Sequence, residues 1–282
     1  MKSREIMLWL VLLPVALFVA LTAYLYFYQK SFVFLPVKEL AASPDQLGLG
    51  YEDIFIDVAS GERIHAWYFP NNTTSHEPER AVLFCHGNAG NISHRLPTAQ
   101  LLAELNVAAL LFDYRGYGRS DGRAGETEAY ADARAAFDWL VNEKGFAPEE
   151  IVIFGRSLGG AVAIELATQV KCAGLLVESS FTSALEMGRK AFPILPIGLL
   201  LKYKFESDER IGKVACRALF VHSPQDDIIP FEMGRVLYDR AVEPKQFFEI
   251  SGRHNEREYL ADPGYIQTVR SFIYDASGPH SE

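Results

Sequence analysis

The sequence predicts an α/β protein: a mostly parallel central sheet with helices on both faces, a small cap, and one transmembrane helix ahead of the domain. Three observations predict this class. Short apolar runs alternate along the chain with segments of helical periodicity. A serine flanked by glycines stands between one such run and one such segment, and a long uncharged stretch lies near the N-terminus.

Eight short segments have the composition of strands. The first alternates apolar and polar residues, which is typical of an edge strand, and the turn Ser60-Gly61-Glu62 joins it to a hairpin partner. In chain order, strands are expected at Tyr51–Val58, Ile64–Phe69, Ala81–Cys85, Val107–Phe112, Ile151–Phe154, Gly174–Val177, Ala218–Val221 and Phe247–Ile250. Helices are expected at Arg95–Leu105, Glu126–Val141, from Ser157 to about Thr168, Glu232–Arg240 and Tyr265–Tyr274.

We expect three parts in the chain: a membrane anchor over residues 1–30, a globular domain over 31–276 and a tail over 277–282. Within the domain, the segment from Phe181 to Lys213 is too long for a simple connection between strands. Its apolar part, Ala191 to Leu201, predicts a cap insertion at about 181–213. The alternative is a helix that packs on the edge of the sheet.

The stretch from Ile6 to Tyr28 contains no charged residue. As a helix it would be about 34 Å long, enough to cross a hydrocarbon core of about 30 Å. Lys2 and Arg4 precede the stretch, and Lys30 and Lys38 follow it. This small difference in flanking charge favours a cytoplasmic N-terminus and a domain on the non-cytoplasmic side. A cleavable signal peptide is the alternative, although no A-x-A site follows the stretch.

Composition argues against several classes of protein. The net charge of −9, without a basic stripe, argues against a nucleic-acid partner. The three cysteines are scattered, so no disulfide framework is expected. No H-E-x-x-H or similar ligand spacing occurs, so we expect no metal. The glycine-rich stretch His86–Asn91 matches neither a Walker A nor a G-x-G-x-x-G pattern, and we expect no cofactor.

Ser157 is the strongest functional signal. It is the central residue of Gly155-Arg156-Ser157-Leu158-Gly159, between a predicted strand and a predicted helix, which is the context of a nucleophile elbow. The glycines allow the strand and the helix to approach each other closely. A tight turn with an inert serine is the alternative.

A serine hydroxyl needs a base to take its proton. In this architecture the chain order is serine, acid, histidine, and each follows the end of a strand. His254 follows the last predicted strand and is our predicted base. His222, at the end of the preceding strand, is the rival.

The acid that orients the base is expected after the strand that ends at His222. Asp226 and Asp227 both stand there, and their spacing does not separate them. Glu178, after the strand before, would serve in a variant arrangement.

Negative charge that develops on a substrate oxygen needs backbone N–H donors. The residue after the nucleophile, Leu158, is one expected donor. The second is expected in the glycine-rich loop after Cys85, where we choose Asn88.

These motifs occur in one order and together resemble the α/β-hydrolase superfamily, and within it the membrane-anchored serine hydrolases of the bud-emergence type. The resemblance runs from about Ser31 to Phe272 and rests on the segments His86-Gly87-Asn88-Ala89-Gly90-Asn91-Ile92, Asp113-Tyr114-Arg115-Gly116-Tyr117-Gly118, Gly155-Arg156-Ser157-Leu158-Gly159-Gly160, Asp226 with Pro230, and His254-Asn255.

The resemblance implies that Ser157 is the nucleophile, His254 the base, and Asn88 and Leu158 the oxyanion donors. It also implies Asp226 as the acid, because the group places its acid four residues before the proline. This chain departs from the group at Ser223 and Arg253, where glycine is usual.

The expected reaction is hydrolysis of a carboxylic ester or thioester through an acyl-Ser157 intermediate. An anchor and an apolar cap in one chain suggest an acyl or lipid substrate. A peptidase or amidase with the same three residues and a non-catalytic binding protein that keeps the fold are the alternatives.

Overall fold

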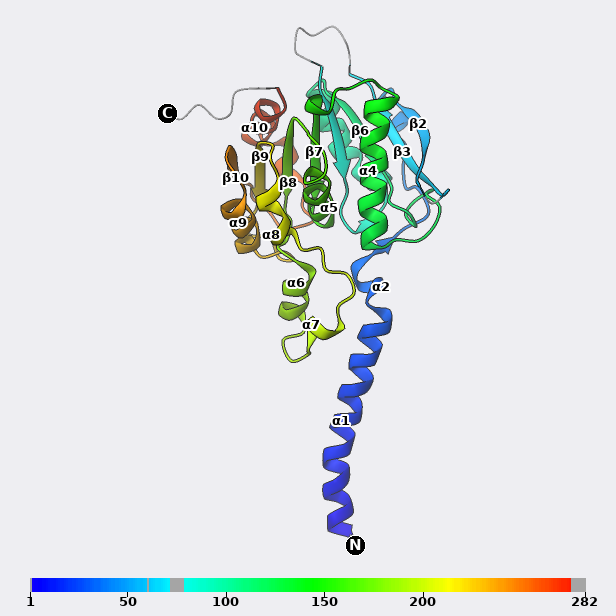
Figure 1. The fold of residues 1–282 in the computed structure, drawn as a ribbon, viewed down its shortest axis with the longest axis vertical. Coiled ribbons are helices and arrows are strands. Elements are labelled where there is room, and N and C mark those ends of the chain that lie inside the picture. Colours follow the sequence, from blue (N-terminus) through cyan, green and yellow to red (C-terminus); the bar gives the residue numbers. More distant parts are fainter. Residues whose placement is uncertain (1, 60, 72–78, 275–282) are drawn as a thin grey trace.

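The computed structural model describes residues 2–59, 61–71 and 79–274 (Figure 1). The predicted tail over 277–282 lies outside the described residues. After the N-terminal helix in the sequence, the chain forms one α/β unit built on an eight-stranded sheet. The strands are β2 (Glu52–Asp57), β3 (Arg63–Phe69), β4 (Ala81–Cys85), β6 (Ala108–Phe112), β7 (Ile151–Arg156), β8 (Gly174–Glu178), β9 (Ala218–His222) and β10 (Lys245–Glu249).

The strand order is β10-β9-β8-β7-β4-β6-β3-β2, and among these described strands β3 alone runs in the direction opposite to the others. The predicted mostly parallel sheet is therefore confirmed, as are the hairpin and the edge position of its first strand. The inner strands are buried along their whole length, which explains their continuous apolar sequence.

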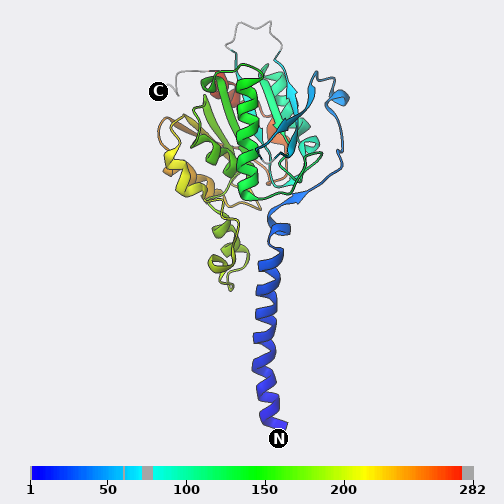
Figure 2. The ribbon, with the colours of Figure 1, turned by 45° about the vertical axis from the view of Figure 1, so that its right-hand side comes forward.

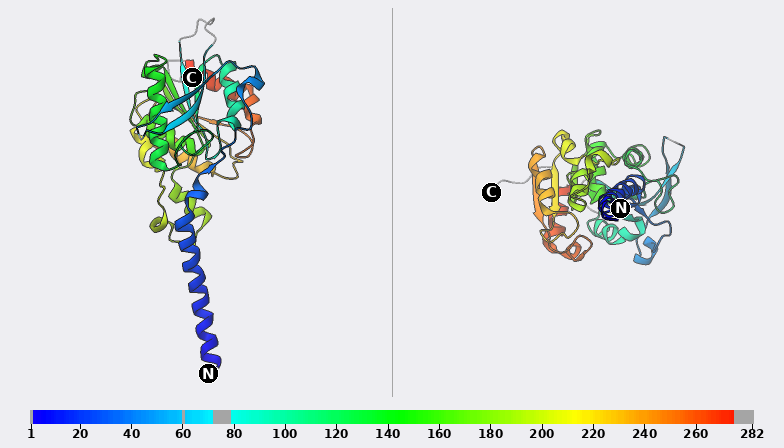
Figure 3. Two further views of the ribbon diagram at one scale, coloured as in Figure 1. Left: turned by 90° about the vertical axis from the view of Figure 1, so that its right-hand side faces the viewer. Right: turned by 90° about the horizontal axis from the view of Figure 1, so that it is seen from below.

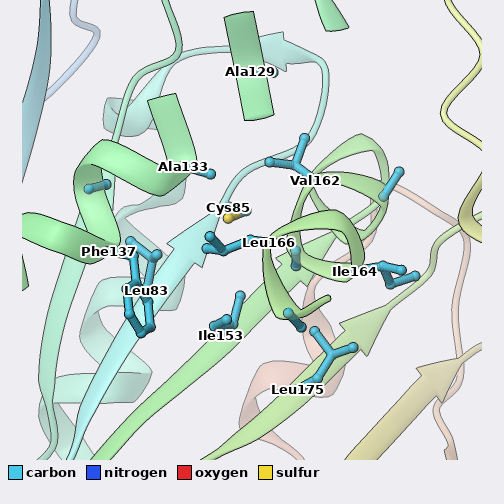
Figure 4. Packing of buried hydrophobic residues seen from close by; sticks show 14 of the residues in the cluster. Leu83, Cys85, Ala129, Ala133, Phe137, Ile153, Val162, Ile164, Leu166 and Leu175 are labelled. Atoms are coloured by element: carbon cyan, nitrogen blue, oxygen red, sulfur yellow. The ribbon is translucent and has the colours of Figure 1, made fainter. Parts of the chain in front are cut away.

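Helices cover both faces of the sheet, and successive strand residues point to opposite faces. On one face Leu83 and Ile153 belong to the cluster that contains Phe137 of α4 and Leu166 of α5, as Figure 4 shows from close by. On the other face the core includes residues of α3 and α10. The helices of the domain outside the insertion are α3 (Leu96–Glu104), α4 (Glu126–Asn142), α5 (Leu158–Ala167), α9 (Phe231–Arg240) and α10 (Pro263–Tyr274). Short 3₁₀ turns occupy Pro44–Leu47, Ile92–Arg95, Pro148–Glu150, Ile211–Lys213 and Glu258–Ala261.

The N-terminal segment forms the long helix α1 (Lys2–Tyr28), followed by the short helix α2 (Lys30–Val33). Helix α1 extends away from the domain as a single stalk (Figures 1 and 3). Its part Met7–Tyr28 is long and apolar enough to cross a membrane, and within the described residues none of its most apolar stretch is buried.

Directly after α2 the chain makes a contact that its sequence does not reveal. Strand β1 (Leu35–Pro36) pairs in parallel with β5 (Ala89–Gly90), in the glycine-rich loop that follows β4. Two-residue strands are too short to show periodicity, so no pattern predicts this pair. It joins the end of the N-terminal helices to the loop that contains Asn88.

The insertion between β8 and β9 contains three short helices: α6 (Ala184–Ala191), α7 (Ile197–Leu200) and α8 (Ser207–Arg210). Helix α8 lies against α5 and α9, beside the sheet. Helices α6 and α7 instead project from the domain on the side from which α1 leaves it (Figures 1 and 2), and α7 contacts α1. We call the segment Ala184–Leu201, which contains α6 and α7, the cap.

Candidate active site

Ser157 lies at the turn between β7 and α5, where the sequence motif places it. Its backbone has φ 56° and ψ −122°, a conformation that L-residues rarely adopt. The surroundings leave no room for side chains at Gly155 and Gly159, because an added Cβ would overlap the carbonyl oxygen of Gly159 or of Cys85, respectively. The close approach of strand, helix and neighbouring loop therefore explains both glycines.

His254 contacts both Ser157, from which 97 residues separate it along the chain, and Asp226, from which 28 residues separate it. The hydroxyl oxygen of Ser157 lies 3.2 Å from Nε2 of His254. Nδ1 of His254 lies 2.7 Å from Oδ2 of Asp226. All three side chains are buried or nearly so. This is a continuous hydrogen-bonded chain from a carboxylate through an imidazole to a hydroxyl.

The turn after β9 distinguishes the two neighbouring aspartates. Oδ1 of Asp226 accepts hydrogen bonds from the backbone N–H groups of Ile228 and Ile229, at 2.9 and 2.7 Å. Asp227 points elsewhere: its Oδ1 accepts from the backbone N–H of His254, at 3.2 Å, and does not touch the imidazole. Asp226 alone of the two orients the ring.

Asp226 remains a carboxylate in this setting. Burial by itself raises its pKa, but hydrogen bonds from His222 and His254 and from the Ile229 amide outweigh burial and hold the pKa well below its usual value. His222, the rival base, lies 3.3 Å from the same carboxylate and donates toward the carbonyl of Ile229. It supports the acid rather than facing the serine.

Glu178, the other acid considered, belongs to a separate buried network. Its carboxylate accepts from Arg156 Nε at 2.9 Å and from the hydroxyls of Tyr259 and Tyr265 at 2.6 and 2.7 Å. The same arginine donates through Nη2 to the carbonyl oxygen of His254. Arg156 thus connects Glu178 to the backbone carbonyl of His254, and not to its imidazole ring. We did not predict this network, which we call the Glu178 brace. Its signal in the sequence was Arg156, a charged residue inside the serine motif.

Ser223 links the loops of the acid and the base. Its hydroxyl donates to the carbonyl of Gly252 at 2.6 Å and accepts from the N–H of Gln225 at 3.0 Å. The departure from glycine therefore adds a connection between the two loops.

Asn88 and Leu158 lie at the same cavity as Ser157. Within the described part of the chain, neither backbone N–H donates a hydrogen bond to another residue. The loop of Asn88 is held from outside: its carbonyl accepts from the N–H of Leu35 at 3.0 Å and from the hydroxyl of Tyr117 at 2.7 Å. Its side chain donates to the carbonyl of Val33 at 3.2 Å.

A cavity of about 530 Å³ opens beside Ser157. Its walls are mainly apolar and come from three places: the loops around Ser157 and His254, the cap, and the N-terminal helices. The cap contributes Met187 and Ile197 among others, and α1 and α2 contribute Leu25 and Phe32. Mainly apolar walls of this kind suit an apolar ligand group.

Gln29, between α1 and α2, is a second residue that we did not predict. It is buried, donates to the carbonyl of Leu200 at 3.1 Å and accepts from the N–H of Lys202 at 2.7 Å. It joins the N-terminal helices to the cap at the edge of the cavity. Its position as the first polar side chain after the aromatic end of the apolar stretch was the available signal.

Comparison with known proteins agrees with the fold. The model of the alpha/beta hydrolase family matches residues 82–272. An uncharacterized protein of Mycobacterium tuberculosis is 36% identical over 271 residues, covering 94% of this chain and 96% of its own. Protein bem46 of Schizosaccharomyces pombe is 28% identical over 261 residues, covering 89% and 87%, which confirms the predicted resemblance to the bud-emergence group.

Among solved structures, an esterase of Pyrococcus furiosus superposes with a TM-score of 0.69 at 19% identity, covering 86% of this chain and 97% of its own. At that identity the likeness concerns the fold, and the fold is that of the alpha/beta hydrolases. Because the family model matches more than half of the chain and the mycobacterial relative matches nearly all of it, this protein belongs to the alpha/beta hydrolase family.

Proposed function

We propose that this protein is a serine hydrolase that cleaves carboxylic esters or thioesters of acyl compounds through an acyl-Ser157 intermediate. The observation that carries the proposal is the hydrogen-bonded chain from Asp226 through His254 to Ser157, at the floor of an apolar cavity. The family is one of hydrolases, and a solved structure with this fold is an esterase.

In the proposed reaction, Nε2 of His254 takes the proton of the Ser157 hydroxyl as its oxygen attacks the substrate carbonyl carbon. Asp226 accepts from Nδ1 and stabilises the imidazolium that forms. The N–H groups of Asn88 and Leu158 then donate to the carbonyl oxygen as it gains negative charge.

The same groups complete the cycle. His254 returns the proton to the leaving alcohol or thiol, which leaves an acyl ester on Ser157. A water molecule, deprotonated by His254, attacks the acyl carbon and releases a carboxylic acid and free Ser157. No step needs a further cofactor, because the proton that His254 takes in each half-reaction is returned in the same half.

We further propose a single-pass membrane protein with an anchor over residues 1–30 and a hydrolase domain over 31–276. The length and hydropathy of Met7–Tyr28 support the anchor. The burial of Gln29 against the cap supports a helix that stays attached, rather than a signal peptide that is removed. The flanking charges support a domain on the non-cytoplasmic side.

A fluorophosphonate probe tests the proposed function, because it reacts only with an activated serine. We expect the wild-type protein to be labelled and Ser157→Ala to remain unlabelled. Ser271→Ala is the matched control and should label like the wild type, because Ser271 lies in α10 and does not line the cavity. An unlabelled wild type would favour a non-catalytic binding protein.

A further inference from the structure

The end of the N-terminal helix forms part of the substrate cavity, so the anchor has a second structural role. Leu25, Gln29 and Phe32 line the cavity together with Ser157. The next residues hold the loop of Asn88 through the pairing of β1 with β5. One continuous stretch, from Leu25 to Val37, thus runs from the apolar helix to the immediate neighbourhood of the nucleophile.

The depth of the cap in a bilayer follows from its contacts with α1. A span over Met7–Tyr28 is 22 residues, about 33 Å of helix, which matches a hydrocarbon core of about 30 Å. Tyr24, Tyr26 and Tyr28 then lie at one interface, where aromatic residues are enriched. The Nζ of Lys202, the residue directly after the cap, lies 4.1 Å from the Tyr26 ring centroid. The cap therefore lies at headgroup level.

The surface of the cap has the chemistry of an interfacial segment. Ile194 and Leu199 are 86% and 85% exposed, and Phe192 is 38% exposed. The stretch from Met187 to Lys202 contains Arg189, Lys190 and Lys202 and no aspartate or glutamate, in a chain with a net charge of −9. Exposed apolar side chains surrounded by cations are typical of segments that bind anionic lipid surfaces.

From these contacts we propose that the cap dips into the bilayer surface beside α1, and that the substrate is a membrane-resident acyl ester. Its acyl chain passes between α1 and the cap, along Leu25 and Phe32, until its carbonyl carbon reaches Ser157. The substrate part of this proposal rests on the proposed function; the docking of the cap on lipid does not. The bilayer is the partner of the cap in this proposal because α7, which contains the exposed Leu199, contacts the membrane helix α1.

The catalytic test compares two esters on the full chain reconstituted in vesicles of phosphatidylcholine and phosphatidylserine. p-Nitrophenyl butyrate reaches the site from water, whereas p-nitrophenyl laurate resides in the bilayer. We expect the double variant Ile194→Ser and Leu199→Ser to lower kcat/KM for the laurate by about tenfold or more, since it removes two large apolar side chains from the lipid contact. Hydrolysis of the butyrate should stay unchanged.

Val242→Ser is the matched control, because Val242 is 49% exposed but lies between α9 and β10, outside the cap. It should leave both rates unchanged. Equal losses on both esters, or no loss on the laurate, would overturn the proposed entry route while leaving the serine mechanism in place.

A second measurement needs no catalysis. In vesicles with brominated lipids, the added fluorescence of Ile194→Trp should be quenched, and that of Val242→Trp should not. The native tryptophans give the same background in both variants. If the tryptophan at position 194 is quenched no more than the one at 242, the cap does not touch lipid and the docking proposal is wrong, whatever the enzyme hydrolyses.

Discussion

The floor and the roof of the cavity are built by opposite means. The floor is polar and buried: Ser157, His254 and Asp226 are held in a chain of hydrogen bonds. The roof, made of the cap and the end of α1, is apolar and leaves Ile194 and Leu199 almost fully exposed. In the proposed reaction, the floor holds the reacting atoms in place before a substrate arrives, whereas the roof offers apolar surface to it.

This difference separates chemistry from recognition within one site. Changes in the floor are expected to alter the rate for every substrate by a similar factor. Changes in the roof are expected to alter the rate for long-chain substrates alone.

Ser157→Ala should lower kcat by about 10⁶ for short and long esters alike, as it does for comparable triads. The hydroxyl that forms the intermediate is lost, whatever the acyl group. Hydrolysis assays with butyrate and laurate esters measure the effect. A loss confined to the long ester would break the division, because a floor residue would then act in recognition.

Asp226→Asn should lower kcat by about 10⁴, because the amide stabilises the wrong tautomer of His254 and not its charged form. Asp227→Asn is the neighbouring control. An asparagine oxygen can still accept from the backbone N–H of His254, so its kcat should be nearly that of the wild type. Equal losses in the two variants would contradict the assignment of the acid.

The acid limb of the pH–rate profile should follow one protonation. Because its hydrogen bonds hold the pKa of Asp226 well below the usual value, Asp226 stays ionised across the acid limb. Protonated His254 cannot act as the base, so kcat/KM should fall about tenfold per pH unit on the acid side. A slope of two in a logarithmic plot would mean that the carboxylate titrates as well.

Glu178→Gln should lower the free energy of unfolding by about 3–5 kcal/mol, because it leaves the buried charge of Arg156 without its counter-charge. Glu149→Gln is the control: its pair with Lys171, 3.6 Å apart, is exposed and should contribute less than about 1 kcal/mol. Urea titrations measure both. A loss as small as that of the control would mean that the brace does not stabilise the floor.

The floor was more readable from sequence than the roof, for a physical reason. The proposed nucleophile, acid and base follow strand ends, and the strands are short apolar runs that composition reveals. The sequence spacing does not decide between Asp226 and Asp227 as the acid, because both residues follow the same strand and are adjacent to each other. Only the turn that presents the amides of Ile228 and Ile229 to Asp226 separates them.

The roof depends on contacts between distant segments that carry no periodic signal. The apolar run at Ala191–Leu201 predicts either a cap or a helix on the edge of the sheet. In the structure, α6 and α7 project from the domain, whereas α8 lies against α5 and α9. The hydrogen bonds of Gln29 to the cap join positions more than 170 residues apart. A pattern within one window of sequence does not encode such a pair.

The pairing of β1 with β5 decides where the chain can be shortened. A soluble form that begins at Lys30 keeps Val33 and Leu35, whose backbone groups bind the side chain and the carbonyl of Asn88. A form that begins after Val37 removes those partners and the parallel register with Ala89 and Gly90. Although both forms lack the anchor, only the first retains the segment that supports the loop beside the nucleophile.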